Sequence, residues 1–383
     1  MLPIHPQPLQ NEIISSWMVR LAFSNGYPLH TFYSGLLGYR KAIWNRDVDR
    51  QPPVDLLATL ARLTGQATSV LTSMTLAHYE GTIFESLTLA GRTAWILPVG
   101  VFHRTRRRAG LQFCPKCLKG DPNPYYRKSW RLALYSMCET HLCVMQERCP
   151  ECKSNISFHR LGIGRKKSVF QHNLKFCHRC GFDLGCAPTS IPNWPDIRSL
   201  SGLKKTVGDL DLSSCPYGPR TTPFSIPFFQ GVRVLVGVIN GRNGMRLRQI
   251  LAETIGIEIG QGFSRLNADF EYLPADVRLN LLLTVCWLLE DWPCRFVTAC
   301  SKANFTRSRL AEEIRALPFW LSGVADEFLD NRIFVPSQRE LESAFTYLMY
   351  SNQDISPQSL GALLGLSRDA AKASYKLWKS TQT

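Results

Sequence analysis

Eight cysteine and histidine residues in the middle of the chain have the spacing of metal ligands. They form four pairs, and each pair has two residues between its members. Structural zinc sites take four nitrogen or sulfur ligands in a tetrahedron, and a C-x2-C turn brings two thiolates to one metal. Four such pairs predict two zinc ions with closed, structural sites, so that folding and metal binding are one event. The pairs are Cys114 with Cys117, Cys138 with His141, Cys149 with Cys152, and Cys177 with Cys180.

Sequential pairing is the favoured grouping because the intervals between neighbouring pairs are short. Three cysteines and His141 then hold one zinc ion, and four cysteines hold the other. An interleaved arrangement, in which the first pair shares its metal with the third or fourth, stays open. Three further residues lie beside the proposed ligands and are the alternatives to them, namely Cys143, Cys186 and His178.

The positive charge of the chain is concentrated around these pairs. The formal net charge is +15, and residues 92–180 hold 18 basic and 4 acidic residues, a local net charge of +14. Charge concentrated in one module favours a polyanionic partner such as nucleic acid, although solvated loops are the alternative. No basic amphipathic helix with an aromatic face accompanies the charge, which disfavours a membrane surface. The candidate contacts are Arg104, Arg106, Arg107, Arg108, Arg165, Lys166 and Lys167.

Helical patterns flank this basic segment on its N-terminal side. Apolar residues recur at helical spacing over 13–21 and again over 54–63, where Gly65 follows, and a short helix is expected to begin near Thr68. Helix, glycine turn and helix form the outline of a helix-turn-helix. Plain helical packing is the alternative for this hairpin.

A second helix-turn-helix is predicted over residues 355–380. Ser356 and Pro357 are a favoured N-cap and first helical residue, Gly365 ends that helix, and Ser367 caps the next. The second helix carries basic residues on one face, as a recognition helix does toward DNA. A solvated face or a protein contact is the alternative for these residues, which are Arg368, Lys372, Lys376 and Lys379.

The predicted fold class is mainly α and multi-domain. A helical, helix-turn-helix-like domain covers 1–100, a tandem zinc-finger (zinc-ribbon-like) module 101–190, a linker or irregular stretch 191–227, and a helical domain ending in the helix-turn-helix 228–383. No apolar run reaches the roughly 20 residues that span a bilayer, and no secretory signal begins the chain. We therefore expect a soluble, cytoplasmic protein with reduced thiols. No catalytic motif is found, so we expect no enzyme.

The central stretch resembles the TniQ/TnsD family of transposition target-selection proteins. The family pattern is F-C-P-x-C, an aromatic pair with arginine, W-x-L-A, C-x2-H and C-P-x-C. Besides the cysteines and His141, it maps onto Phe113, Pro115, Tyr125, Tyr126, Arg127, Trp130, Leu132, Ala133 and Pro150. The N-terminus resembles the family at Pro6, Pro8, Glu12, Ser16, Trp17, Arg20, Leu21, Ala22, Asn25 and Gly26.

The resemblance implies a non-catalytic adaptor that brings the AAA+ ATPase and transposase of a transposon to a chosen site. Some members bind target DNA directly, as TnsD does. Shorter members, as homodimers, join an RNA-guided Cascade complex of type I CRISPR with its guide RNA, and the length of this chain suits that group. The resemblance implies a bacterial protein that is nucleoid-associated when on target DNA. The alternatives are a TnsD-like direct selector and a transcription regulator with helix-turn-helix and zinc fingers.

Overall fold

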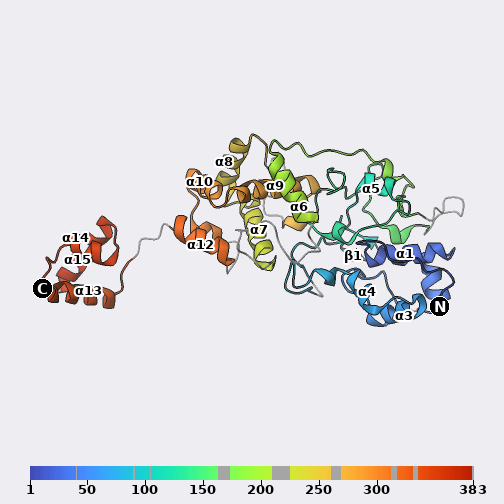
Figure 1. The fold of residues 1–383 in the computed structure, drawn as a ribbon, viewed down its shortest axis with the longest axis horizontal. Coiled ribbons are helices and arrows are strands. Elements are labelled where there is room, and N and C mark those ends of the chain that lie inside the picture. Colours follow the sequence, from blue (N-terminus) through green and yellow to red (C-terminus); the bar gives the residue numbers. More distant parts are fainter. Residues whose placement is uncertain are drawn as a thin grey trace. The chain divides into compact units, whose positions relative to one another are not determined.

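The computed structural model describes the chain in nine segments with short gaps between them. Its regular structure is mainly helical, as the sequence predicts. The chain folds into two compact units, Met1–Phe328 and Leu329–Thr383 (Figure 1). The predicted domain boundaries at 100, 190 and 227 fall inside the first unit and stay predictions. The described residues are 1–39, 41–88, 91–103, 105–162, 173–208, 225–259, 269–311, 317–330 and 335–381.

The first unit begins with short helices around one buried helix, α1. Nearly every side chain of α1 is buried, including Trp17, and Asn25 is the C-cap that ends the helix before Gly26. Gly65 ends α3 in the left-handed conformation with φ +72°, which a glycine adopts without steric cost. The helices are α1 (Ile14–Ser24), α2 (Leu29–Thr31), η1 (Phe32–Leu36), α3 (Val54–Thr64), α4 (Thr68–Ser73) and η2 (Leu76–Tyr79).

The middle of the first unit has little regular structure. Its described residues form one two-stranded antiparallel hairpin, several isolated β-bridges and short helical turns. Since such a segment makes few internal ladder hydrogen bonds, its fold depends on side-chain contacts and on the cysteine groups described below. Its elements are β1 (Val101–Phe102), β2 (Thr105–Arg106), α5 (Pro115–Gly120), η3 (Lys128–Arg131), η4 (Phe158–Arg160) and η6 (Leu184–Cys186).

A helical bundle around α9 completes the first unit. Most residues of α9 are buried, and it packs against α6, α7 and α10 (Figure 1). Helix α6 lies in the stretch predicted as a linker or irregular segment, and it is ordered because Leu203 and Val207 are buried on its inner face. The helices are α6 (Ile197–Gly208), α7 (Ser225–Asn240), α8 (Met245–Ile255), η7 (Phe270–Tyr272), α9 (Ala275–Glu290), α10 (Cys294–Ala303), α11 (Arg307–Ala311) and α12 (Phe319–Phe328).

Two buried arginines join the middle segment to the helices on either side of it. Arg131 is 1% exposed and donates hydrogen bonds to Asp47 and Asp49 of the N-terminal region. Arg278 of α9 is fully buried and donates at 2.9 Å to Glu147, which lies between the second and third cysteine pairs. A charge this deep in a protein persists only when it is paired, so these two contacts hold the three segments in one arrangement.

The second unit is a group of three helices, α13 (Gln338–Tyr350), α14 (Pro357–Leu364) and α15 (Arg368–Thr381). Helix α13 begins with a capping box formed by Ser337 and Glu340. The core includes Phe345 and Leu360, and the Trp378 ring stacks on Phe345 with centroids 4.1 Å apart. Helix α14 ends at Gly365 with φ +65°, as expected. Two helices joined by a short turn are thus in place, whereas a DNA-binding helix-turn-helix stays a prediction.

Candidate metal centres

The first two predicted ligand pairs meet in one group, which we call centre 1. Cys114 stands at the N-cap of α5 and Cys117 in its first turn, while Cys138 and His141 lie in the turn between the bridged residues 137 and 144. Nδ1 of His141 lies 3.5 Å from Sγ of Cys114, 3.3 Å from that of Cys117 and 3.6 Å from that of Cys138. One imidazole nitrogen therefore faces three sulfurs.

These distances are those of a tetrahedral zinc site. With Zn–S bonds of about 2.3 Å and Zn–N bonds of about 2.0 Å, the tetrahedron has edges of roughly 3.8 Å between sulfurs and roughly 3.5 Å between sulfur and nitrogen. The Cys117 and Cys138 sulfurs are 3.7 Å apart, and the three sulfur–nitrogen distances span 3.3–3.6 Å. The donor set and its spacing therefore fit one zinc ion.

The third and fourth pairs meet in a second group, centre 2. The Sγ atoms of Cys149 and Cys180 are 3.5 Å apart, and those of Cys152 and Cys177 are 3.6 Å apart. The Ser154 hydroxyl lies 3.1 Å from the Cys152 sulfur. Burial raises the pKa of the Cys152 thiol, but hydrogen bonds from Ser154 and from neighbouring thiols outweigh it and lower this pKa to about 6. A thiol that ionises readily is suited to bind metal, since the thiolate is the ligand.

Three of the four turns share one backbone pattern. In each, the amide of the fifth residue donates to the carbonyl of the first ligand, and the amide of that ligand donates to the carbonyl five residues on. The fifth residue takes a positive φ, which costs little for Gly181 but on the order of 1 kcal/mol for Leu142 or Lys153. The hydrogen bonds are Leu142 to Cys138, Lys153 to Cys149, Gly181 to Cys177, Cys138 to Cys143, Cys149 to Ser154 and Cys177 to Phe182, at 2.8–3.0 Å.

The two centres differ in their access to solvent. The three cysteines of centre 1 are buried and His141 is half-buried. In centre 2, Cys180 is exposed and Cys152 half-buried. Each group offers four ligand atoms, all within 4.8 Å of one another, so it could hold a metal ion with its coordination complete. A metal there would act as a staple and would offer no position to a substrate.

The grouping of the pairs is sequential, and none of the three alternative ligands joins a group. Cys143 is fully buried with its sulfur 3.5 Å from that of Cys114, yet it lies outside the four-atom set of centre 1. Cys186 is exposed in η6, and His178 stays outside the set of centre 2. Ser154, which contacts two sulfurs of centre 2, carries no sequence signal of its own.

Apart from Arg106, the predicted nucleic-acid contacts fall into three classes. The side chains of α15 are exposed on one face of that helix. Arg107 and Arg108 are also exposed, and each guanidinium lies over an aromatic ring, that of Phe102 at 3.6 Å and that of Tyr272 at 4.2 Å. Four candidates lie outside the described residues, namely Arg104, Arg165, Lys166 and Lys167. The exposed residues of α15 are Arg368, Lys372, Lys376 and Lys379.

Arg106 differs from its neighbours because it faces inward. It is half-buried, and its Nη1 is a buried atom with no hydrogen-bond partner among the described residues. Burial lowers the pKa of its guanidinium, and the carboxylates of Asp47 and Asp49 oppose this shift. Within β2 the exposed Thr105 precedes Arg106, and successive side chains of a strand point to opposite faces, which turns Arg106 inward. Arg106 therefore belongs to the buried charge network around Arg131.

Comparison with known proteins identifies one family. The family model described as TniQ matches residues 3–145. The match contains all four side chains of centre 1 and ends before the first ligand of centre 2. No curated protein matches the chain. No helix within the described segments is long and apolar enough to cross a membrane.

Proposed function

We propose, from the match of residues 3–145 to the TniQ family model, that the chain is a non-catalytic adaptor that selects target sites for DNA transposition. A TniQ domain points to a role in transposition target selection, and members of the family generally act as adaptors. The family match is the observation that carries the proposal. The two closed groups of ligand atoms support it, since an adaptor needs rigid surfaces and no open metal position.

We propose that both centres bind zinc and act as structural staples. The sulfur-rich donor sets suit zinc, and the sulfur–sulfur and sulfur–nitrogen distances match a zinc tetrahedron. The middle segment that they hold contacts the N-terminal helices through Arg131 and the α9 helix through Arg278. Zinc binding would thus keep the N-terminal helices, the middle segment and α9 in one fixed arrangement.

The finer proposal is that the chain works as a homodimer bound to an RNA-guided Cascade complex. In that complex it recruits the AAA+ ATPase to the chosen site. The length of the chain, which suits the shorter members of the family, supports this mode. Direct binding of a target sequence is the second candidate, and the basic exposed face of α15 is the observation that favours it.

A co-purification experiment separates the two modes. The tagged chain is expressed with Cascade subunits and a guide RNA, and in parallel with the AAA+ ATPase of the same transposon. The RNA-guided mode predicts that Cascade and guide co-purify with the chain, and that no duplex sequence is protected by the chain alone. A footprint on one duplex sequence without Cascade would instead establish the direct mode. If neither Cascade, nor the ATPase, nor a DNA sequence is bound, the adaptor function itself is refuted.

The basic face of α15 is tested by a pair of charge-removing substitutions. Lys372→Gln with Lys376→Gln should weaken DNA binding and lower the slope of log affinity against log salt by about two, if both contact phosphates. The matched control is Lys204→Gln with Lys205→Gln, which removes the same charge from α6. Equal effects of the two pairs would assign the binding to overall charge and would exclude α15 as the DNA contact.

A further inference from the structure

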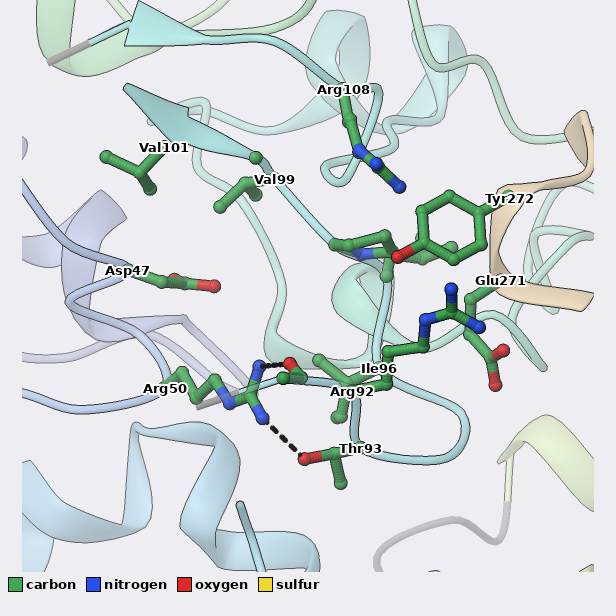
Figure 2. A pocket seen from close by; sticks show the side chains of 14 residues that line it. Asp47, Arg50, Arg92, Thr93, Ile96, Val99, Val101, Arg108, Glu271 and Tyr272 are labelled. Atoms are coloured by element: carbon green, nitrogen blue, oxygen red, sulfur yellow. Dashed lines mark hydrogen bonds between the residues drawn. The ribbon is translucent and has the colours of Figure 1, made fainter. Parts of the chain in front are cut away.

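A basic cavity lies in the first unit, and none of the residues that line it is a metal ligand. Its volume is about 300 Å³, at the lower end for ligand-binding pockets. It is formed by the loop over residues 91–101, the residues Asp47 and Arg50, Arg108, and the end of η7 (Figure 2). We call it the Arg108 cavity. Its lining residues come from four separate stretches of the sequence, so only the fold assembles it.

One wall of the cavity is set by Arg50. Its guanidinium donates to the Gly91 carbonyl at 2.9 Å and to the Thr93 hydroxyl at 2.8 Å (Figure 2). It also donates to the Thr88 hydroxyl at 2.8 Å. Each of these acceptors is neutral, and no carboxylate of the described residues is within ion-pair distance of Arg50. Arg50 is therefore held in a fixed position, and the carboxylate that acts on its charge, that of Asp47, is also the ion-pair partner of Arg131.

The other wall is a tyrosine ring between two arginines. The guanidinium carbon of Arg108 lies 4.2 Å from the centre of the Tyr272 ring, and that of Arg92 lies 5.1 Å from it (Figure 2). Arg92 also pairs with Asp269, whereas among the described residues Arg108 has no carboxylate partner. A guanidinium held over the face of a ring can still offer N–H donors to an anion.

The acidic residues that line the cavity are already paired with arginines that do not line it. Asp47 accepts two hydrogen bonds from Arg131. Glu271 accepts from the Trp95 amide at 2.7 Å and pairs with Arg233. The charges that the cavity offers to a ligand are therefore those of Arg50 and Arg108, together with the remaining donors of Arg92. Such a site attracts anions.

The backbone keeps Arg108 in this place. Gly100 has φ +56°, and a Cβ at this position would lie 2.9 Å from Cγ of Arg108. The amides of Arg107 and Arg108 donate to the carbonyls of residues 100 and 99, which closes the loop over the cavity wall. Arg107, the next residue, points to the Phe102 ring and does not line the cavity. Two adjacent arginines thus have different surroundings.

We propose that the Arg108 cavity binds a phosphate group and accepts one nucleotide of a nucleic-acid strand. The arginine edges bind the phosphate, and the Tyr272 ring with its stacked guanidinium contacts the sugar or base. A recess of this size suits a single nucleotide unit better than a continuous duplex backbone. The choice of a strand over a free nucleotide rests on the proposed function, whereas phosphate binding itself does not.

The test compares two neighbouring arginines that carry the same charge. Arg108→Gln and Arg107→Gln each remove one positive charge from the same loop, and only Arg108 lines the cavity. Binding of deoxyadenosine monophosphate, inorganic phosphate and a single-stranded DNA oligonucleotide is measured by titration calorimetry on the full chain. We expect Arg108→Gln to weaken binding of the mononucleotide roughly tenfold, the loss of a charge-assisted hydrogen bond, and Arg107→Gln to leave it unchanged.

The binding results distinguish a nucleotide from inorganic phosphate as the ligand of the cavity. Saturable mononucleotide binding that is lost in Arg108→Gln, together with a larger loss of oligonucleotide affinity than in Arg107→Gln, supports the proposal. Equal losses in the two variants overturn it, as does binding of inorganic phosphate that the nucleoside part does not strengthen. Tyr272→Leu, which changes no charge, should weaken the mononucleotide but leave inorganic phosphate unchanged.

The failure of this proposal is distinguishable from that of the proposed function. A chain that recruits its transposition partners but binds no mononucleotide refutes the cavity proposal alone. A chain that binds the mononucleotide but recruits no partner refutes the adaptor function alone. The urea midpoint of each variant is measured alongside, and a variant that unfolds early is replaced by Arg108→Lys, which keeps the charge and loses the paired N–H edge.

Discussion

Replacing the buried Arg131 with methionine should strongly destabilise the first unit. The guanidinium is 1% exposed and donates to Asp47 at 3.0 and 2.6 Å, to Asp49 at 3.0 Å and to the Leu97 carbonyl at 3.1 Å. Asp49 also accepts from the amide and hydroxyl of Ser15 in α1. Arg131→Met keeps most of the volume of the side chain but leaves two carboxylates in the core without their cation.

The size of the effect follows from the burial of the pair. Removing one partner of a buried ion pair costs about 3–5 kcal/mol, compared with about 5–15 kcal/mol for the whole stability of a domain. With a urea m-value of about 3 kcal/mol per molar, the unfolding midpoint should fall by roughly 1–1.7 M. The Arg198→Met control removes an exposed arginine whose nearest carboxylates are 3.9 and 4.0 Å away, and we expect a shift below about 0.3 M.

The loss of stability in Arg131→Met should also depend on pH. Burial raises the pKa of Asp47, but Arg131 outweighs this and lowers the pKa below its ordinary value. Such a lowered pKa contributes stability above the pKa of the unfolded chain, about 3.9, and this stability is lost as pH falls through the folded value. Without Arg131, burial raises the pKa in the folded state. The variant therefore loses stability as pH rises, and its deficit grows from about pH 4 to about pH 7.

Urea unfolding followed by tryptophan fluorescence measures both effects, with zinc in constant excess so that metal loss does not contribute. The variant and the control are compared at about pH 5 and about pH 7. A midpoint for Arg131→Met no lower than that of Arg198→Met would refute the reasoning that the three segments depend on this pair. A deficit that shrinks as pH rises would refute the assigned pKa directions.

Three other predictions concern the metal centres, a helix contact and a cap. Zinc release to a chelator should have two phases, and centre 2, which contains the exposed Cys180, should lose its zinc first. Cys180→Ser should remove the fast phase, and a single phase in the unsubstituted protein would contradict the difference in solvent access. Gly231→Ala should destabilise the first unit by about 1–3 kcal/mol, because its Cβ would lie 2.0 Å from the Trp320 ring. Gly323→Ala, with open space around it, should stabilise the same unit by about 0.5–1 kcal/mol, and thermal unfolding of the two variants checks the opposite signs. Hydrogen bonds from Ser337 lower the pKa of Glu340, so the capping stability of α13 should be present above the pKa of the unfolded chain and lost as pH falls through the lower folded value. A fall in the amide-exchange protection factors at this helix terminus in acid, each taken relative to the intrinsic exchange rate at the same pH, checks it, and unchanged protection factors would contradict it.

Local features could be predicted from sequence because they depend on neighbours in the chain. The helix ends at Gly65 and Gly365 and the cap at Ser337 are set by backbone conformation within a few residues. The Pro- and Gly-rich stretch around α6 was the exception. Its helix is stabilised by burial of Leu203 and Val207 against α9, a contact between residues about 80 positions apart that no local pattern carries.

The sequence by itself determined the ligand types, their spacing in pairs and the place of the positive charge, because a C-x2-C turn and a run of arginines are local properties. Only the tertiary structure decided between sequential and interleaved grouping, since thiolates with the same spacing are interchangeable until the turns meet. It also separated Arg106, turned toward Asp47 and Asp49, from Arg108, stacked on Tyr272. Arginines two positions apart have the same charge, and burial, which depends on distant residues, decides whether that charge is used inside the fold or stays accessible.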